Sequence, residues 1–160
     1  MAANSFLIFK NNKELFAIPV GKVHSILEIP RITNLPEAPD FLIGVISFRD
    51  SVLPVIDFNI KFFMIHTQIK KESCIIVTDI LIEQTALLIG ILVDEVIEVN
   101  EIMNSQILDS PSIGSIYKSQ FIEGMMQRDN GFIQFVNIDK VFSISEVSDI
   151  QQANPNNNLI

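Results

Sequence analysis

The sequence predicts an all-β protein made of two small, related barrels. Its apolar segments are short and rich in β-branched and aromatic residues, and turn residues separate them, which is typical of strands. Two blocks of sequence also occur twice. Such repetition indicates one supersecondary unit used twice, and two copies in 160 residues favour paired barrels over a solenoid, which needs about three repeats. Side chains fill barrels of this size, so the sequence predicts a protein that offers surfaces rather than a deep catalytic cavity.

The first repeated block is FLIGVISFRDSVLPVID at residues 41–57, which returns as FIEGMMQRDNGFIQFVNID at residues 121–139. Phe41 and Gly44 match Phe121 and Gly124 at a spacing of 80 residues. The Arg-Asp pair at 49–50 recurs at 128–129 after a one-residue slip. The second block is the apolar pattern of residues 20–29, and it returns 73 residues later without a gap: Val20, Val23, Ile26, Glu28 and Ile29 become Val93, Val96, Val99, Glu101 and Ile102.

The first half of the chain contains two predicted hairpins. Segments 5–9 and 15–18 flank the polar turn KNNKE, and segments 42–48 and 52–57 flank a turn at residues 49–51. Between the hairpins, residues 20–27 predict a short helix or turn followed by a strand. Three prolines make residues 29–40 an extended, non-helical connector. Residues 60–65 predict one or two helical turns, and residues 67–72 predict a loop.

The second half repeats this arrangement. Segments 73–78, 85–92 and 96–101 predict strands, and residues 109–119 predict a loop. Segments 121–127 and 132–136 pair around RDNG, where Asn-Gly is a strong hairpin signal, and residues 138–142 predict a short helix. We expect one domain over residues 1–145, with barrels of about 15–72 and of 1–14 plus 73–145. Residues 146–160 predict a polar, frayed C-terminal tail.

Composition limits the classes of partner. Hydrophobic residues make up 48% of the chain and charged residues 19%, which is enough apolar material for a large core. The net charge of −8 disfavours nucleic acid and anionic membranes, because phosphate binding needs a high density of Lys and Arg. No apolar run approaches the length of about 18 residues that spans a membrane, and no secretory signal is present. The single cysteine, Cys74, cannot form an internal disulfide, which predicts a cytoplasmic location.

The chain offers few residues for catalysis. Its only histidines are His24 and His66, whereas a zinc site needs about three or four ligands. Cys74 lies in a predicted buried strand, where thiols are usually inert, and the glycines are too isolated to form a phosphate loop. Asp57 and Asp94 follow apolar runs, where a carboxylate typically caps a turn or helix. We therefore expect no enzyme, no cofactor and no metal.

Three positions have both a structural and a functional interpretation. Arg49, at a hairpin tip between apolar strands, is either a solvated turn residue or an anchor at a partner interface, where arginine is enriched. Gly44 favours a strand bend, with close approach of another backbone as the alternative. Val23 favours the core, with an exposed apolar contact as the alternative.

The segment PVGKVHSILEIPRITNLPEAPDFLIGVISFRDSVLPVIDFNIKFF at residues 19–63 resembles the CheW-like coupling domain of bacterial chemotaxis. That family typically reads P-V-x-x-V-x-E-I and then I-T-x-L-P-x-A-P-x-F-V-x-G-V-I-N-L-R-G-x-V-L-P-V-I-D. GILVDEVIEVNEI at residues 90–102 resembles the family's G-I-x-V-D-x-V-x-x-V, and residues 121–142 resemble its last hairpin and helix. The resemblance covers roughly residues 5–143 without a large gap.

The resemblance implies two five-stranded SH3-like barrels packed around a shared apolar core, with a few short helices. It also implies a non-enzymatic adaptor that bridges the hairpin tip of methyl-accepting receptors and the regulatory domain of a CheA-type histidine kinase. The groove between the barrels would receive an apolar face of a receptor helix. The positions expected to bind these partners are Val23, Gly44, Ile46, Arg49 and Asp50.

Three departures from the family pattern fall in the block expected to face the receptor. Ser25 stands where the family has the glutamate of V-x-E-I, and Asp50 stands where it has glycine. Ser47-Phe48 replaces the usual Asn-Leu before Arg49. These changes leave two alternatives: a divergent paralogue that serves another motility pathway, or a kinase-binding competitor with weakened receptor binding. Under the second, restoring Glu at Ser25 and Gly at Asp50 increases receptor binding.

Overall fold

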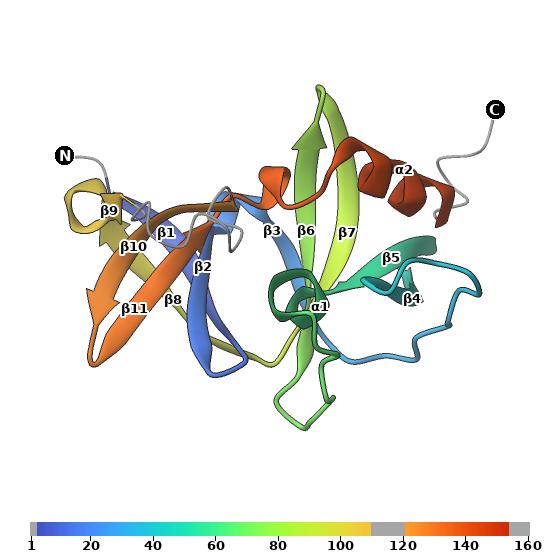
Figure 1. Ribbon diagram of the computed structural model, residues 1–160, viewed down its shortest axis with the longest axis horizontal. Coiled ribbons are helices and arrows are strands. Elements are labelled where there is room, and N and C mark those ends of the chain that lie inside the picture. The colour runs from blue at the N-terminus through green and yellow to red at the C-terminus, as the bar shows by residue number, and fades with distance from the viewer. Residues whose placement is uncertain (1–2, 110–120, 154–160) are drawn as a thin grey trace.

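The computed structural model of the chain describes residues 3–109 and 121–153, which form two twisted sheets side by side (Figure 1). The six-stranded sheet has the order β8 (Glu95–Met103), β1 (Ala3–Asn11), β2 (Glu14–Pro19), β11 (Gly131–Val136), β10 (Ile122–Arg128) and β9 (Leu108–Asp109). The five-stranded sheet has the order β3 (Val23–Glu28), β6 (Cys74–Ile82), β7 (Thr85–Val93), β5 (Ser51–Asp57) and β4 (Leu42–Phe48). The helices are η1 (Val20–Lys22), α1 (Phe58–Phe63), η2 (Asn104–Gln106), η4 (Ile138–Lys140) and α2 (Ile144–Ala153).

The two sheets are built on one plan, as the internal repeats predict. In each sheet a single strand, β3 or β8, pairs with a hairpin, and that hairpin pairs in parallel with the last strand of a second hairpin. The pairing of β3 with β6 skips His24, and the pairing of β8 with β1 skips Ile97. These bulged residues are 73 positions apart, which is the spacing of the second sequence repeat. A bulge therefore confirms the equivalence of β3 and β8 independently of residue identity.

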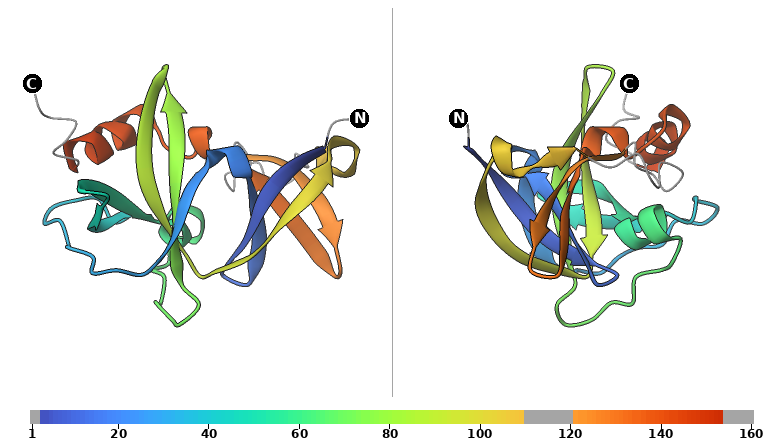
Figure 2. Two further views of the ribbon diagram at one scale, coloured as in Figure 1. Left: turned by 180° about the vertical axis from the view of Figure 1, so that it is seen from behind. Right: turned by 60° about the vertical axis from the view of Figure 1, so that its left-hand side comes forward.

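The predicted division into barrels of 15–72 and 1–14 plus 73–145 is wrong. Strand β2 pairs with β1 and β11, whereas β6 and β7 pair with β3 and β5. The chain crosses between the sheets after β2 and again after β7. In Figure 2, β3 runs from the first crossing into the five-stranded sheet, and β8 runs from the second crossing into the six-stranded sheet. The predicted boundary at residues 14–15 fails because it separates two strands that a tight turn joins. Two-residue turns with positive φ, at Asn12-Lys13 and Glu83-Gln84, keep β1 with β2 and β6 with β7 in the same sheet. The barrels consist of residues 3–19 with 95–109 and 121–136, and of residues 23–93.

The predicted polar tail is also wrong over residues 146–153, which belong to α2. Val147 and Ile150 of this helix are buried in the core shared by the two barrels. The Ser143 hydroxyl accepts from the Glu146 N–H at 3.2 Å, and the Glu146 carboxylate accepts from the Ser143 N–H at 2.8 Å. This capping box is readable in the sequence as S-x-x-E. Residues 154–160, and most of the predicted loop 109–119, lie outside the described residues.

Helix α1 lies where the two barrels meet (Figure 1). Its Phe58 ring contacts Phe9 of β1 and Phe16 of β2, with ring centroids 5.1 and 4.9 Å apart, so it packs against the six-stranded barrel. Phe58 also belongs to the shared core cluster, which includes Ile76 and Ile89 of the five-stranded barrel. Edge-to-face aromatic pairs of this kind stabilise by roughly 0.5–1.5 kcal/mol beyond their buried area. The short helix is thus a structural joint between the barrels.

An ion pair fixes α2 on this joint. Lys61 Nζ lies 2.6 Å from Glu146 Oε2 and within 5.5–5.9 Å of the ring centroids of Phe41, Phe121 and Phe142. Burial of Glu146 acts to raise its pKa, but hydrogen bonds from Lys61 and Ser143 and the charge of Lys61 outweigh burial, so the pKa lies below its ordinary value. A lowered carboxyl pKa contributes stability that is present above the unfolded-state pKa of about 4.3 and is lost as pH falls through the folded-state value.

We therefore expect Glu146→Gln to lower the free energy of unfolding by about 1 kcal/mol near pH 7, because it weakens a charged hydrogen bond. The difference from the wild type should shrink as the pH falls through the lowered folded-state pKa of Glu146, below which the carboxyl is protonated in both states. Urea unfolding across this pH range measures both quantities. Glu101→Gln, at an exposed position of β8, is the matched control and should show neither effect. A difference that does not depend on pH would contradict the ionic role of Glu146.

Candidate partner-binding site

The hairpin β4–β5 presents Arg49 and Asp50 at its tip. Phe48 pairs with Ser51, so Arg49 and Asp50 form a two-residue turn, with φ of 49° and 63°. Positive φ at both central residues is the pattern of a type I′ turn, which matches the twist of the flanking strands. Aspartate tolerates this conformation better than most residues, so Asp50 serves where the family pattern has glycine. Both side chains are exposed.

Arg49 is supported by an aromatic ring rather than by a carboxylate. Its guanidinium carbon lies 5.1 Å from the ring centroid of Phe48, a cation–π contact. Within residues 3–109 and 121–153, the ion pairs join Lys22 to Asp139, Lys61 to Glu146 and Arg128 to Glu98, and none involves Arg49. The charge of Arg49 therefore faces solvent, where a partner can reach it.

Strand β3 lies beside this tip. The ring of His24 contacts the ring of Phe48, with centroids 5.8 Å apart, which brings together the two edge strands of the five-stranded sheet. His24 and Ile26 are on the exposed side of β3, and Ile26 is 47% exposed. We call the surface formed by His24, Ile26 and Arg49 the edge patch. It combines a cation, an imidazole and an apolar side chain.

The other predicted site residues lie deeper. Val23 is half-buried at the start of β3 and packs against the shared core. Ile46 is 3% exposed and belongs to the interior of the five-stranded barrel, so it shapes β4 from within rather than facing a partner. Of the five predicted residues, the structure brings Arg49 and Asp50 together at the surface and leaves Ile46 and Gly44 beneath it.

Gly44 allows a close approach of backbones, and the approaching segment is the chain's own connector. Thr33 and Val45 exchange two backbone hydrogen bonds of 2.9 Å. A Cβ atom at Gly44 would lie 2.3 Å from the Thr33 carbonyl oxygen, and the φ of Gly44 is 156°. Gly124 has the same role in the six-stranded barrel, where a Cβ atom would lie 2.8 Å from the Leu108 carbonyl oxygen in β9. The two-residue β9 is thus the counterpart of the Thr33–Val45 bridge, and it explains the sixth strand.

The structure corrects the predicted match between Arg49 and Arg128. Gly44 pairs with Val55 and Gly124 pairs with Phe135, and the register then runs without a slip to the pairs Phe48–Ser51 and Arg128–Gly131. Arg128 therefore occupies the position of Phe48, the last residue before the turn. The repeated Arg-Asp letters suggested a one-residue slip that the strand pairing does not contain.

Sequence reasoning missed the edge patch because it did not consider β3 as an exposed strand. Residues 23–28 alternate between half-buried and exposed positions, and this alternation is the signal that could have placed His24 and Ile26 outside. It also missed Phe48 as the support of Arg49. Nothing local in the sequence indicates that the rings of residues 24 and 48 meet, because this contact depends on the closure of the barrel.

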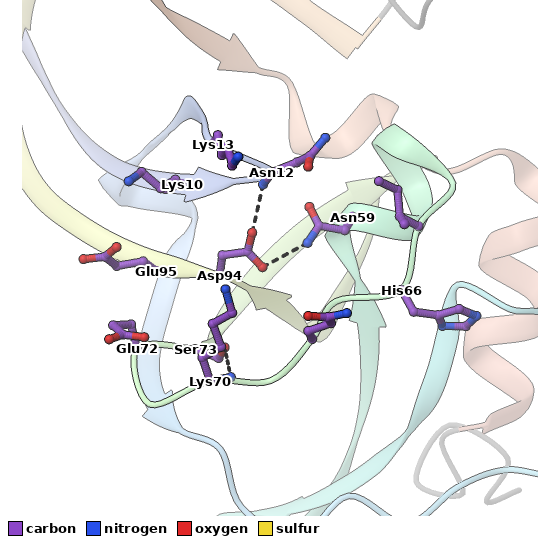
Figure 3. Close-up of a pocket in the computed structure, with 12 residues that line it drawn as sticks. Lys10, Asn12, Lys13, Asn59, His66, Lys70, Glu72, Ser73, Asp94 and Glu95 are labelled. Atoms are coloured by element: carbon purple, nitrogen blue, oxygen red, sulfur yellow. Dashed lines mark hydrogen bonds between the residues drawn. The ribbon is translucent and has the colours of Figure 1, made fainter.

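A polar pocket of about 390 Å³ lies on another part of the surface, between the β1–β2 turn and the segment after α1 (Figure 3). Asp94 accepts hydrogen bonds there from the Asn12 N–H at 2.8 Å and from Asn59 Nδ2 at 2.9 Å. The Ser73 hydroxyl accepts from the Lys70 N–H at 2.8 Å. These polar groups are thus engaged in holding the fold together.

Elsewhere, burial raises the pKa of the Cys74 thiol, which keeps it protonated and unreactive.

The described ranges 3–109 and 121–153 contain no group of three or more His, Cys, Asp or Glu side chains arranged to hold a metal ion. None of the helices there is both long and apolar enough to cross a membrane.

The fold and the edge patch define a two-barrel interaction domain, and comparison with known proteins identifies its family. The model of the CheW-like domain matches residues 5–146, so the chain belongs to the CheW-like domain family. The chemotaxis protein CheW of Rhizobium meliloti is 27% identical over 140 residues, which cover 88% of each chain. That of Bacillus subtilis is 28% identical over 147 residues, covering 89% of this chain and 92% of the relative.

A solved structure shows the same architecture. The crystal structure of the scaffolding protein TtCheW from Thermoanaerobacter tengcongensis superposes with a TM-score of 0.77 and 27% sequence identity. The match covers 91% of this chain and 92% of that protein. The predicted fold class, two SH3-like barrels packed together, is confirmed.

We expect Gly44→Ala to lower the free energy of unfolding by about 2–3 kcal/mol, because the added methyl group meets the backbone carbonyl of Thr33. Gly21→Ala is the matched control: a Cβ atom there meets nothing within 4 Å, so its effect should stay below about 0.5 kcal/mol. Urea unfolding of both variants checks the difference. Equal stabilities would show that the connector can shift away from β4 at little cost.

Proposed function

We propose that this protein is a cytoplasmic, non-enzymatic adaptor that couples methyl-accepting chemotaxis receptors to the regulatory domain of a CheA-type histidine kinase. The observation that carries the proposal is the edge patch, in which an exposed Arg49 stands at a hairpin tip of a CheW-like domain and forms no ion pair with the described residues. The likeness to chemotaxis proteins and to a scaffolding protein, which covers about nine-tenths of each chain, supports the same role.

The mechanism that we propose is positional. An adaptor of this kind holds the kinase where a shift in receptor conformation changes the kinase's own equilibrium, and it does so without a covalent step. Two rigid barrels joined by a packed helix suit this task, since a rigid body transmits a displacement from one bound partner to the other. We assign Val23, Arg49 and Asp50 to the receptor-facing surface, with Gly44 and Ile46 supporting the strand from inside.

Two variations of this role stay open to experiment. In the first, the protein is a divergent paralogue that serves another motility pathway with its own receptor. In the second, it binds the kinase and competes with a coupling protein, because Ser25 replaces the family's glutamate. The positive φ of Asp50 argues for retained coupling, since the turn keeps its type I′ form without glycine.

Reconstitution of kinase autophosphorylation tests the proposal. We expect kinase activity to become receptor-dependent when the wild-type protein is added to purified cognate receptor and kinase. Arg49→Ala should reduce this receptor-dependent activity on the order of 10-fold, as for loss of an interface anchor. Arg31→Ala, an exposed arginine in the connector, is the matched control and should act as the wild type does. If kinase activity does not depend on the receptor although the folded wild-type adaptor is present, the proposal is contradicted.

A further inference from the structure

The two barrels close by different chemistry at equivalent positions. In the six-stranded barrel, Glu98 of β8 forms an ion pair with Arg128, the last residue of β10. Asn100 Nδ2 also donates to the Glu98 carboxylate, at 3.2 Å. In the five-stranded barrel, Ser25 stands at the position of Glu98, and Phe48 stands at that of Arg128. The contact that joins the edge strands there is between the rings of Phe48 and His24.

This equivalence shows what the five-stranded barrel lacks. The side chain at position 98 reaches position 128, so the side chain at position 25 is directed toward position 48. The guanidinium of Arg49 lies over the ring of Phe48, so a carboxylate at position 25 would be within its reach. The chain has a hydroxyl there instead, which is in contact with His24 Nδ1 at 3.2 Å. Arg49 is therefore an exposed cation beside a position from which a carboxylate is missing.

We infer that the receptor supplies this carboxylate: the edge patch binds a receptor segment that places an Asp or Glu side chain against Arg49 and an apolar side chain against Ile26. The inference rests on the proposed function and names the chemistry of its receptor contact. Charge complementarity carries it, because a partly desolvated arginine at an interface gains most from a carboxylate. The exposed Ile26, on the same side of β3 as His24, provides an apolar contact near such a pair.

Substitutions at Ser25 test the inference by offering Arg49 an internal carboxylate. In equilibrium binding to the purified cognate receptor signalling fragment, we expect Ser25→Glu to bind on the order of 10-fold more weakly than Ser25→Gln, because the new glutamate competes with the receptor. Glutamine has nearly the same size without the charge, so it is the matched control. Equal binding by the two variants, or tighter binding by Ser25→Glu, would overturn the inference. Tighter binding would instead support the competitor hypothesis.

Substitutions at Arg49 give an independent test that needs no internal pair. Arg49→Glu should bind the receptor several-fold more weakly than Arg49→Gln, because like charges repel, and raising the salt concentration should reduce this difference. Equal affinities of the two variants would overturn the inference. Both variants should bind the kinase regulatory domain equally well, and a charge-dependent loss on the kinase would show that the carboxylate is not the receptor's.

The failure of this inference is distinguishable from failure of the proposed function. If the wild type makes kinase activity receptor-dependent while the charge variants behave alike, the adaptor role stands and the acidic contact is wrong. If the folded wild type does not bind the receptor at all, both are wrong.

Discussion

The arrangement of the two barrels depends on the buried side-chain amide of Asn59, in the first turn of α1. Its oxygen accepts from Asn11 Nδ2 of β1 at 2.9 Å, and its nitrogen donates to Asp94, at the crossover into β8, at 2.9 Å. Asp94 also accepts from the N–H of Asn12 in the β1–β2 turn. One amide thus joins the β1–β2 hairpin of the six-stranded barrel, the helix that follows β5 in the five-stranded barrel and the segment that crosses between the barrels (Figure 3). Removing a partner from a buried amide costs free energy, so these hydrogen bonds favour one arrangement of the barrels.

The position of Asn59 is itself set by a helix cap. Asp57 accepts from the Asn59 N–H at 2.9 Å and from the Thr67 hydroxyl at 2.6 Å, which starts α1 and holds the segment that follows it. In the other repeat, Asn137 accepts from the Asp139 N–H at 3.1 Å and starts η4. The same turn therefore produces a joint between barrels in one repeat and a short 3-10 turn leading to α2 in the other. The aromatic residues Phe58, Phe62 and Phe63 account for the difference, since they give α1 an apolar face to bury.

The hairpins, the two-barrel plan and the capping role of Asp57 could be predicted because each depends on local sequence or on repetition. The crossover could not, because the tight turns hold β1 with β2 and β6 with β7 but do not decide which distant strand each of these hairpins pairs with. The helix α2 was readable from its capping box but was obscured by its polar composition. The predicted match of Arg128 with Arg49 was wrong because it followed residue identity. The strand register instead follows from Gly44 and Gly124, which the close backbone contacts require. At the site, Arg49 was found from its place in a turn, whereas His24 and Phe48 depend on how the barrel closes.

The hydroxyl of Ser25, at the position where the other barrel has Glu98, illustrates how a surface can differ without disturbing the fold. An exposed ion pair typically contributes about 0–1 kcal/mol to stability, so losing the carboxylate at position 25 costs the barrel little. The rings of His24 and Phe48 supply the closing contact in its place, and Phe48 also supports the freed guanidinium. In the six-stranded barrel, Arg128 at the position of Phe48 forms an ion pair with Glu98, which also accepts from Asn100, so a change there would disturb more than one partner. The two barrels, built on one plan, therefore differ at a position that contributes little to stability, and Arg49 stays exposed and outside the ion pairs among the described residues.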